Sequence, residues 1–261
     1  TQLGIHPEKG SFFLSHDQDV QTLVVLVHGF SACPGTMKRL ASYFYDQGLD
    51  CYGVRLAGHG QQLVDFEYTT QEEWLLSISS VLDVAKLDYQ KIVLVGCSTG
   101  ALLSLRLSHF AHVCGVVCLS LFLKPCNPKF YFGIYFSFLS RIWRGSFGFT
   151  SNNTLSTSED GPETVPDFWY LKFPIRAIFQ LAICVRETKT ILKRVFCPCF
   201  LIHSRYDHTA HVDSVKIAQQ KLCSAETTVH WCDGGHVFIL NQDSQVDQKI
   251  LDFILGCSKK K

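Results

Sequence analysis

Short apolar runs alternate along the chain with longer segments in which apolar residues recur every three or four positions. Most of the short runs are rich in Val, Ile and Leu, and they are too short for typical helices. Continuous apolar runs of this kind are typical of strands that are buried on both faces of a parallel sheet. We expect strands at residues 23–27, 51–56, 92–95, 113–119, 199–203 and 227–231.

Helices are expected in the segments that separate these strands. A capping box, T-Q-E-E at residues 70–73, precedes an apolar stripe at helical spacing and marks the start of one helix. Strands that alternate with helices predict right-handed βαβ units and a mainly parallel sheet, which is an α/β fold. The expected helices lie between Pro34 and Gly48, over 70–85 and 100–111, near 211–222, and over 246–255.

Only residues 124–194 break the alternation, and they lie between two of the expected strands. We therefore expect an inserted cap on a core that is formed by residues 1–123 and 195–261. The cap holds ten Lys or Arg and five Asp or Glu, whereas the net charge of the whole chain is only +1. A basic, aromatic segment suits contact with anionic lipid, and ordinary scatter of surface charge explains the count equally well.

Composition narrows the class of protein. Hydrophobic residues make up 47% of the chain and charged residues 18%, which excludes a disordered protein. The small net charge gives no sign of a nucleic-acid partner. The uncharged, largely apolar run at residues 107–123 is shorter than a membrane span requires. Because the sequence starts with Thr1 and its single methionine is Met37, we expect an excerpt or a processed chain.

The twelve cysteines form no C-x-x-C pair, and no histidine cluster follows them at zinc-finger spacing, so we expect no metal site. Several of them, such as Cys51 and Cys118, lie inside apolar runs, where a free thiol behaves as a small hydrophobe. We therefore expect reduced thiols and a reducing compartment such as the cytoplasm.

The strongest chemical motif is G-C-S-T-G at residues 96–100, which has the pattern G-x-S-x-G. It follows the strand expected at 92–95 and opens the next helix, which is the setting that the motif requires. Small neighbours let the strand-to-helix turn close and lift the serine hydroxyl above the sheet. We predict that Ser98 is a nucleophile. The alternative is a helix cap in which its hydroxyl only bonds backbone.

A serine nucleophile needs a base. His236 lies in the sequence G-G-H, in the loop between the last expected strand and the last helix, and this loop reaches the same sheet edge as Ser98. His203 lies within an expected strand, and His109 and His112 lie on or near a helix end. These three positions favour structural roles, so we predict His236 as the general base.

The acid that orients the histidine should follow a strand between the serine and the histidine. Asp207 does so, directly after the strand expected at 199–203. Asp213 starts an expected helix, where an acidic residue is common as a cap. Asp233 is too close to His236 in a glycine-rich turn. We therefore predict Asp207 as the acid.

Two backbone N–H groups should form the oxyanion hole. Thr99 supplies one as the residue after the nucleophile, and we assign the other to Phe30, in the loop after the first strand. Gly29 allows this backbone to approach the substrate closely.

These segments resemble the small bacterial carboxylesterases and monoacylglycerol lipases of the α/β-hydrolase superfamily. The resemblance covers roughly residues 11–123 and 195–257. The most specific parts are V-H-G-F at 27–30, L-A-G-H-G at 56–60 and G-H-V-F-I-L at 235–240.

The resemblance implies the α/β-hydrolase fold and ester hydrolysis through an acyl-enzyme, without a metal or an organic cofactor. It implies Ser98 as nucleophile, Asp207 as acid, His236 as base, and Phe30 and Thr99 as oxyanion donors. The chain departs from the family where its motif carries Cys and Thr instead of the frequent Leu. The cap is also aromatic and basic, so substrate choice is the property least transferable from the family.

The cap contains F-Y-F-G-I-Y-F-S-F-L at residues 130–139, for which we expect a helix that is apolar on most faces. The residues predicted to contact the acyl chain of a medium or long ester share one face of it: Phe132, Tyr135, Phe136 and Leu139. Two alternatives stay open, namely a helix that only holds the cap together and one that docks transiently on a membrane surface.

Two other functions are considered. The same residues would serve cleavage of acyl-protein or acyl-CoA thioesters, because both reactions pass through the same acyl-enzyme. A catalytically inactive binding protein of this fold is a further alternative, and the intact nucleophile, base and acid argue against it.

Overall fold

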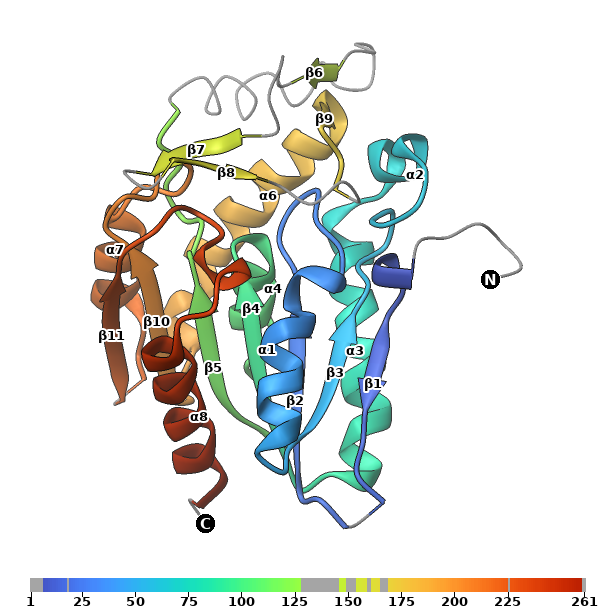
Figure 1. Ribbon diagram of the computed structural model, residues 1–261, viewed down its shortest axis with the longest axis vertical. Coiled ribbons are helices and arrows are strands. Elements are labelled where there is room, and N and C mark those ends of the chain that lie inside the picture. Colours follow the sequence, from blue (N-terminus) through green and yellow to red (C-terminus); the bar gives the residue numbers. More distant parts are fainter. Residues whose placement is uncertain are drawn as a thin grey trace.

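A seven-stranded sheet forms the centre of the molecule (Figure 1). The computed structural model describes residues 7–17, 19–127, 146–148, 154–158, 161–164, 169–224 and 226–259. In the order β1-β3-β2-β4-β5-β10-β11, only β1 is antiparallel to its neighbour. The strands are β1 (Phe12–Leu14), β2 (Thr22–Val27), β3 (Asp50–Val54), β4 (Lys91–Cys97), β5 (Val113–Leu119), β10 (Cys199–Ser204) and β11 (Thr227–Cys232).

Helices cover both faces of the sheet (Figure 1). On one face lie α1 (Gly35–Asp46) and α8 (Ser244–Lys259). The other face carries α3 (Gln71–Asp88), α4 (Thr99–Arg106), α6 (Ile175–Ile191) and α7 (Asp213–Lys221). The shorter elements are α2 (Leu63–Tyr68), η1 (Pro7–Lys9), η3 (Leu192–Arg194), η4 (Phe238–Leu240), and the strand pairs β6 (Ser146–Gly148) with β9 (Lys172–Pro174) and β7 (Thr154–Ser158) with β8 (Gly161–Thr164).

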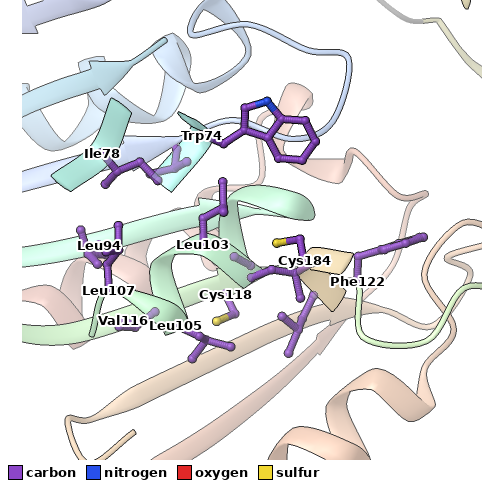
Figure 2. Close-up of a cluster of buried hydrophobic side chains, with 14 of the residues drawn as sticks. Trp74, Ile78, Leu94, Leu103, Leu105, Leu107, Val116, Cys118, Phe122 and Cys184 are labelled. Carbon is purple, nitrogen blue, oxygen red and sulfur yellow. The ribbon is translucent and has the colours of Figure 1, made fainter. Parts of the chain in front are cut away.

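Each parallel strand sends alternate side chains into two hydrophobic clusters, one on each face. Val24 and Leu26 of β2 pack toward α1 and α8, whereas Val25 and Val27 pack toward α3, α4 and α6. Figure 2 shows the cluster on the face covered by α3, α4 and α6, in which Leu103 lies among side chains from neighbouring helices and strands. Full burial of such a side chain stabilises the fold by about 1.5–3 kcal/mol. The parallel strands are thus buried on both faces of the sheet.

The six predicted strands and the mainly parallel α/β fold are confirmed. The helix expected over 100–111 is too long, because α4 ends at Arg106. The chain then turns toward β5, and His112, whose φ is 69°, ends the turn by accepting a hydrogen bond from the N–H of Ile92. The edge strand β1 and the short helix α2 lie outside the predicted elements.

Part of the predicted cap joins the main core. Ala177, Leu181, Cys184 and Val185 of α6 belong to the same hydrophobic cluster as the sheet. The boundaries of the cap remain a prediction, while α6 itself packs as a helix of the sheet domain.

None of the twelve cysteines, all of which lie in the described residues, forms a disulfide, and eight of them are buried. Within the described residues, no group of three or more His, Cys, Asp or Glu side chains could hold a metal ion. In the same parts of the chain, none of the helices has the length and apolar character needed to cross a membrane.

Candidate active site

Ser98 occupies a strained turn between β4 and α4. Its φ is 54° and its ψ is −110°, a conformation that residues with side chains rarely adopt. A Cβ on Gly96 would collide with the backbone of Gly100, and one on Gly100 would collide with the carbonyl of Val27. The turn is fixed further by a 2.8 Å hydrogen bond from the Ser98 N–H to the Leu119 carbonyl. The two glycines of the motif are therefore required by crowding.

Three side chains from distant parts of the sequence form a continuous hydrogen-bonded array at this turn. His236 Nε2 lies 2.9 Å from the Oγ of Ser98, and His236 Nδ1 lies 2.8 Å from Oδ2 of Asp207. A carboxylate only accepts hydrogen bonds, so Nδ1 carries the proton and Nε2 is free to accept the serine proton. All three side chains are buried. The sequence predicted each of these residues, and the structure brings them together.

Asp207 is held as a carboxylate. Its Oδ1 accepts hydrogen bonds of 2.8 Å from the N–H groups of Thr209 and Ala210. Burial by itself would raise the pKa of this carboxyl, but the charge and hydrogen bond of His236, with a smaller effect of His203, lower it below its ordinary value. The acid therefore stays ionised in spite of its burial.

Two serines that sequence reasoning missed hold the loop of His236. Ser120, at the end of β5, donates a 2.6 Å hydrogen bond to the His236 carbonyl, and Ser204, at the end of β10, donates one to the Gly234 carbonyl. Ser120 has a φ of 49° and is fully buried. A lone serine after a strand carries no distinctive pattern, so only the folded structure identifies these contacts.

The loop after β2 lies directly against Ser98. A Cβ on Gly29 would sit 3.4 Å from the Cβ of Ser98, at the limit of ordinary contact. Nδ1 of His28 donates a 2.9 Å hydrogen bond to the Gly29 carbonyl, and the Leu56 N–H donates one of 3.2 Å to Nε2 of His28. Because C=O and N–H of one peptide point in opposite directions, fixing the Gly29 carbonyl also fixes the N–H of Phe30.

His28 is a neutral ring in this arrangement. Burial lowers its pKa from 6.5 to about 4, against a smaller opposing effect of its hydrogen bond to Gly29. The sequence identified the H-G-F motif for its glycine and its phenylalanine, but it gave no role to this histidine. Thr99, the second predicted oxyanion donor, is the first residue of α4 and directly follows Ser98.

The part of the chain that forms the sheet and this site matches a known protein family. The model of the alpha/beta hydrolase family matches residues 24–248, which is most of the chain. The chain belongs to the alpha/beta hydrolase family. The resemblance seen in its motifs is therefore confirmed, and so is the fold that this resemblance implies.

Named relatives of this α/β hydrolase include bacterial esterases. It is 29% identical to a thermostable monoacylglycerol lipase of Bacillus sp. (strain H-257) over 240 residues, which cover 88% of this chain and 89% of the relative. It is 21% identical to a carboxylesterase of Bacillus subtilis (strain 168) over 236 residues, covering 88% and 91%. A solved structure from a study of two metagenome-derived lipolytic enzymes shares the fold, with a TM-score of 0.82, 21% identity, and coverage of 96% and 98%.

In this α/β hydrolase, the two aspartates that were alternatives to Asp207 as the acid have other partners. Asp213 forms ion pairs with Lys124 at 2.6 Å and with Lys216 at 3.1 Å. Asp233 is exposed and pairs with Arg205 at 3.2 Å. Neither carboxylate reaches His236.

The competing histidines have surroundings that differ from those of His236. His203 is buried, donates a 3.0 Å hydrogen bond from Nε2 to the Ala210 carbonyl, and lies 3.5 Å from Oδ2 of Asp207. His109 is exposed, and Nδ1 of His112 lies 2.8 Å from the carbonyl oxygen of Tyr89. The four residues predicted to contact the acyl chain lie outside the described residues: Phe132, Tyr135, Phe136 and Leu139.

Proposed function

We propose that this α/β hydrolase cleaves carboxylic esters through an acyl-enzyme on Ser98. The observation that carries the proposal is the unbroken array from the Ser98 hydroxyl through His236 to Asp207, with hydrogen bonds of 2.9 and 2.8 Å. The names of its bacterial relatives, a monoacylglycerol lipase and a carboxylesterase, support the same reaction class.

In the acylation step, the Oγ of Ser98 attacks the ester carbonyl carbon while Nε2 of His236 takes the hydroxyl proton. Asp207 holds the ring in the required tautomer and stabilises the imidazolium that forms. The N–H groups of Phe30 and Thr99 bind the negative oxygen of the tetrahedral intermediate. This intermediate collapses when the C–O bond to the alcohol breaks, and the alcohol leaves with the proton from His236.

In the second step, water replaces the alcohol. His236 takes a proton from the water as it attacks the acyl carbonyl, and the same N–H groups stabilise the second tetrahedral intermediate. Release of the carboxylic acid returns the proton to Ser98. The proton shuttles between oxygen and Nε2 throughout.

The substrate is an acyl ester or a lipid, and we propose medium or long acyl chains. The aromatic character of residues 130–139 supports this choice, because each buried methylene contributes about 0.8 kcal/mol. Within that segment, Phe132, Tyr135, Phe136 and Leu139 would contact the acyl chain. The basic charge of the cap would also suit transient contact with an anionic membrane surface.

The test is hydrolysis of a chain-length series of acyl esters, with acyl-CoA thioesters measured beside them and Ser98→Ala as the blank. The rate should rise with chain length over several carbons and then fall when the pocket is full. Phe136→Ala should shift that optimum and leave the chemistry intact. A flat profile in the unmutated enzyme would remove the acyl-pocket hypothesis, and hydrolysis of thioesters alone would contradict the assignment as an ester hydrolase.

A further inference from the structure

Residues 169–173, W-Y-L-K-F, pack against the loop that follows β2 although the two segments are far apart in the sequence. The N–H of Tyr170 donates a 3.0 Å hydrogen bond to the Ser31 carbonyl, and Nε1 of Trp169 donates one of 3.1 Å to Oγ1 of Thr36. The ring of Phe173 lies 5.6 Å from the ring of Phe30. Two of these contacts reach the loop itself, and the third reaches the first turn of α1, which follows the loop.

Ser31 needs such support. It is a buried, non-glycine residue with a φ of 62°, a left-handed conformation that persists only where the surrounding structure holds it. Ser31 directly follows Phe30, whose N–H we propose as an oxyanion donor. A relaxation of Ser31 would therefore displace Phe30 and, with it, the Gly29–Phe30 peptide that carries this donor.

Trp169 also bridges the two loops on either side of the nucleophile. Its buried ring belongs to a small cluster with Ala32, from the loop after β2, and Val237, which directly follows His236. The indole thus sets the spacing between the oxyanion loop, residues 29–32, and the histidine loop.

Tyr170 is itself anchored on its far side. Its ring stacks on Phe66, with centroids 5.1 Å apart and an interplanar angle of 14°. Its hydroxyl accepts a 2.8 Å hydrogen bond from the Gln61 N–H and donates one of 3.0 Å to the Gly58 carbonyl. The backbone N–H that holds Ser31 is therefore fixed from both directions.

We propose that Trp169 and Tyr170 are positioning residues, which hold the oxyanion loop in the geometry that stabilises the tetrahedral intermediate. This proposal rests on the proposed function. The physical reason is that donors stabilise a developing charge strongly only when they are fixed before the reaction. A loop held by residues from another part of the chain provides that fixation.

The experiment compares Trp169→Ala and Tyr170→Phe, with Trp169→Phe as a milder variant that keeps an aromatic ring. Leu171→Ala is the matched control, because Leu171 lies in the same segment and is 46% exposed. We expect Trp169→Ala to lower kcat about ten- to hundredfold with little change in KM, which is less than the loss of a whole oxyanion donor. Trp169→Phe and Tyr170→Phe should lower kcat less, and Leu171→Ala should leave kcat unchanged.

The readout that separates positioning from folding is the affinity for an alkylboronic acid, whose tetrahedral adduct with Ser98 mimics the intermediate. Its Kd should rise in proportion to the loss of kcat across the variants. Unchanged kcat and Kd in variants with a lowered Tm would overturn the proposal and leave a purely structural role. A shifted pH profile of kcat/KM with an unchanged Kd would also overturn it, because the effect would then lie in His236. Activity that persists in Ser98→Ala would contradict the proposed function instead.

Discussion

The carboxyl edge of the sheet and the helix-covered core below it are built on opposite principles. Among the described residues, four that are not glycine have a positive φ, and three of them lie at this edge. Ser98 and Ser120 directly follow β4 and β5, and Ser31 lies in the loop after β2. The edge also holds the buried polar groups Asp207 and His236. The core consists of apolar side chains that alternate between two clusters. Backbone strain is thus concentrated at the edge where we propose that the reaction takes place.

The two regions should therefore respond differently to mutation. Changes at the edge should lower activity more than stability, because its contacts orient reacting groups. Changes in the core should lower stability and leave the activity of each folded molecule intact.

The largest effect is expected at the edge, in Asp207→Asn. The neutral amide would favour the wrong tautomer of His236, and kcat should fall by about three to four decades. Steady-state kinetics on a single ester measures this. Asp213→Asn is the matched control, because Asp213 pairs with Lys124, Lys216 and His211, and it should change kcat little. A severe loss in the control with a mild loss in Asp207→Asn would reassign the acid.

In the core, Leu103→Ala should show the opposite signature. Leu103 is fully buried on α4 (Figure 2), so its truncation should lower the free energy of unfolding by about 2–5 kcal/mol. Chemical denaturation measures this loss, and kinetics below the unfolding transition should give an unchanged kcat per folded molecule. A large fall in kcat without a loss of stability would break the distinction between core and edge.

Acid should weaken the fold through its buried neutral histidines. Burial lowers the pKa of His28 from 6.5 to about 4, and it also lowers the pKa of His59 and of His203. As the pH falls from 6.5 to about 4, the unfolded chain takes up a proton that folded His28 does not, so stability falls over this window and levels off below it.

His28 alone would contribute about 3 kcal/mol to this loss. Denaturation at a series of pH values measures this loss of stability. The control variant is His109→Gln, which removes an exposed histidine. A free energy of unfolding that stays flat between pH 6.5 and 4 would contradict the neutral state of these rings.

The smallest expected effect on kcat is the one that distinguishes two buried serines, Ser120 and Ser104. Ser120→Ala removes the hydrogen bond to the His236 carbonyl, and kcat should fall about tenfold, in line with about 1–1.5 kcal/mol for one such bond. Ser104→Ala removes a hydroxyl from α4 that has no partner among the residues that the structure describes, so it should be neutral or slightly stabilising. Equal kinetics in the two variants would remove the positioning role of Ser120.

The sequence predicted the six parallel strands and the Ser98–His236–Asp207 array because both depend on local patterns. Buried strands need apolar runs, and the turn at Ser98 admits only small residues such as Gly96 and Gly100. The short elements β1 and α2 were missed because three to six residues carry no periodicity.

The supporting contacts were not predictable for a different reason. The bond from His28 to the Gly29 carbonyl and the bond from Ser120 to the His236 carbonyl depend on where the backbone lies in three dimensions. Trp169 reaches Thr36 only after the chain has folded. No spacing along the sequence encodes such partners.

The most direct test of the central claim is to map the site that reacts with a fluorophosphonate, because this probe labels only an activated serine. We expect mass spectrometry to find the label on Ser98, Ser98→Ala to abolish labelling, and Cys97→Ala to keep it. Persistent labelling of Ser98→Ala, or none in the unmutated protein, would contradict the assignment of Ser98 as the nucleophile.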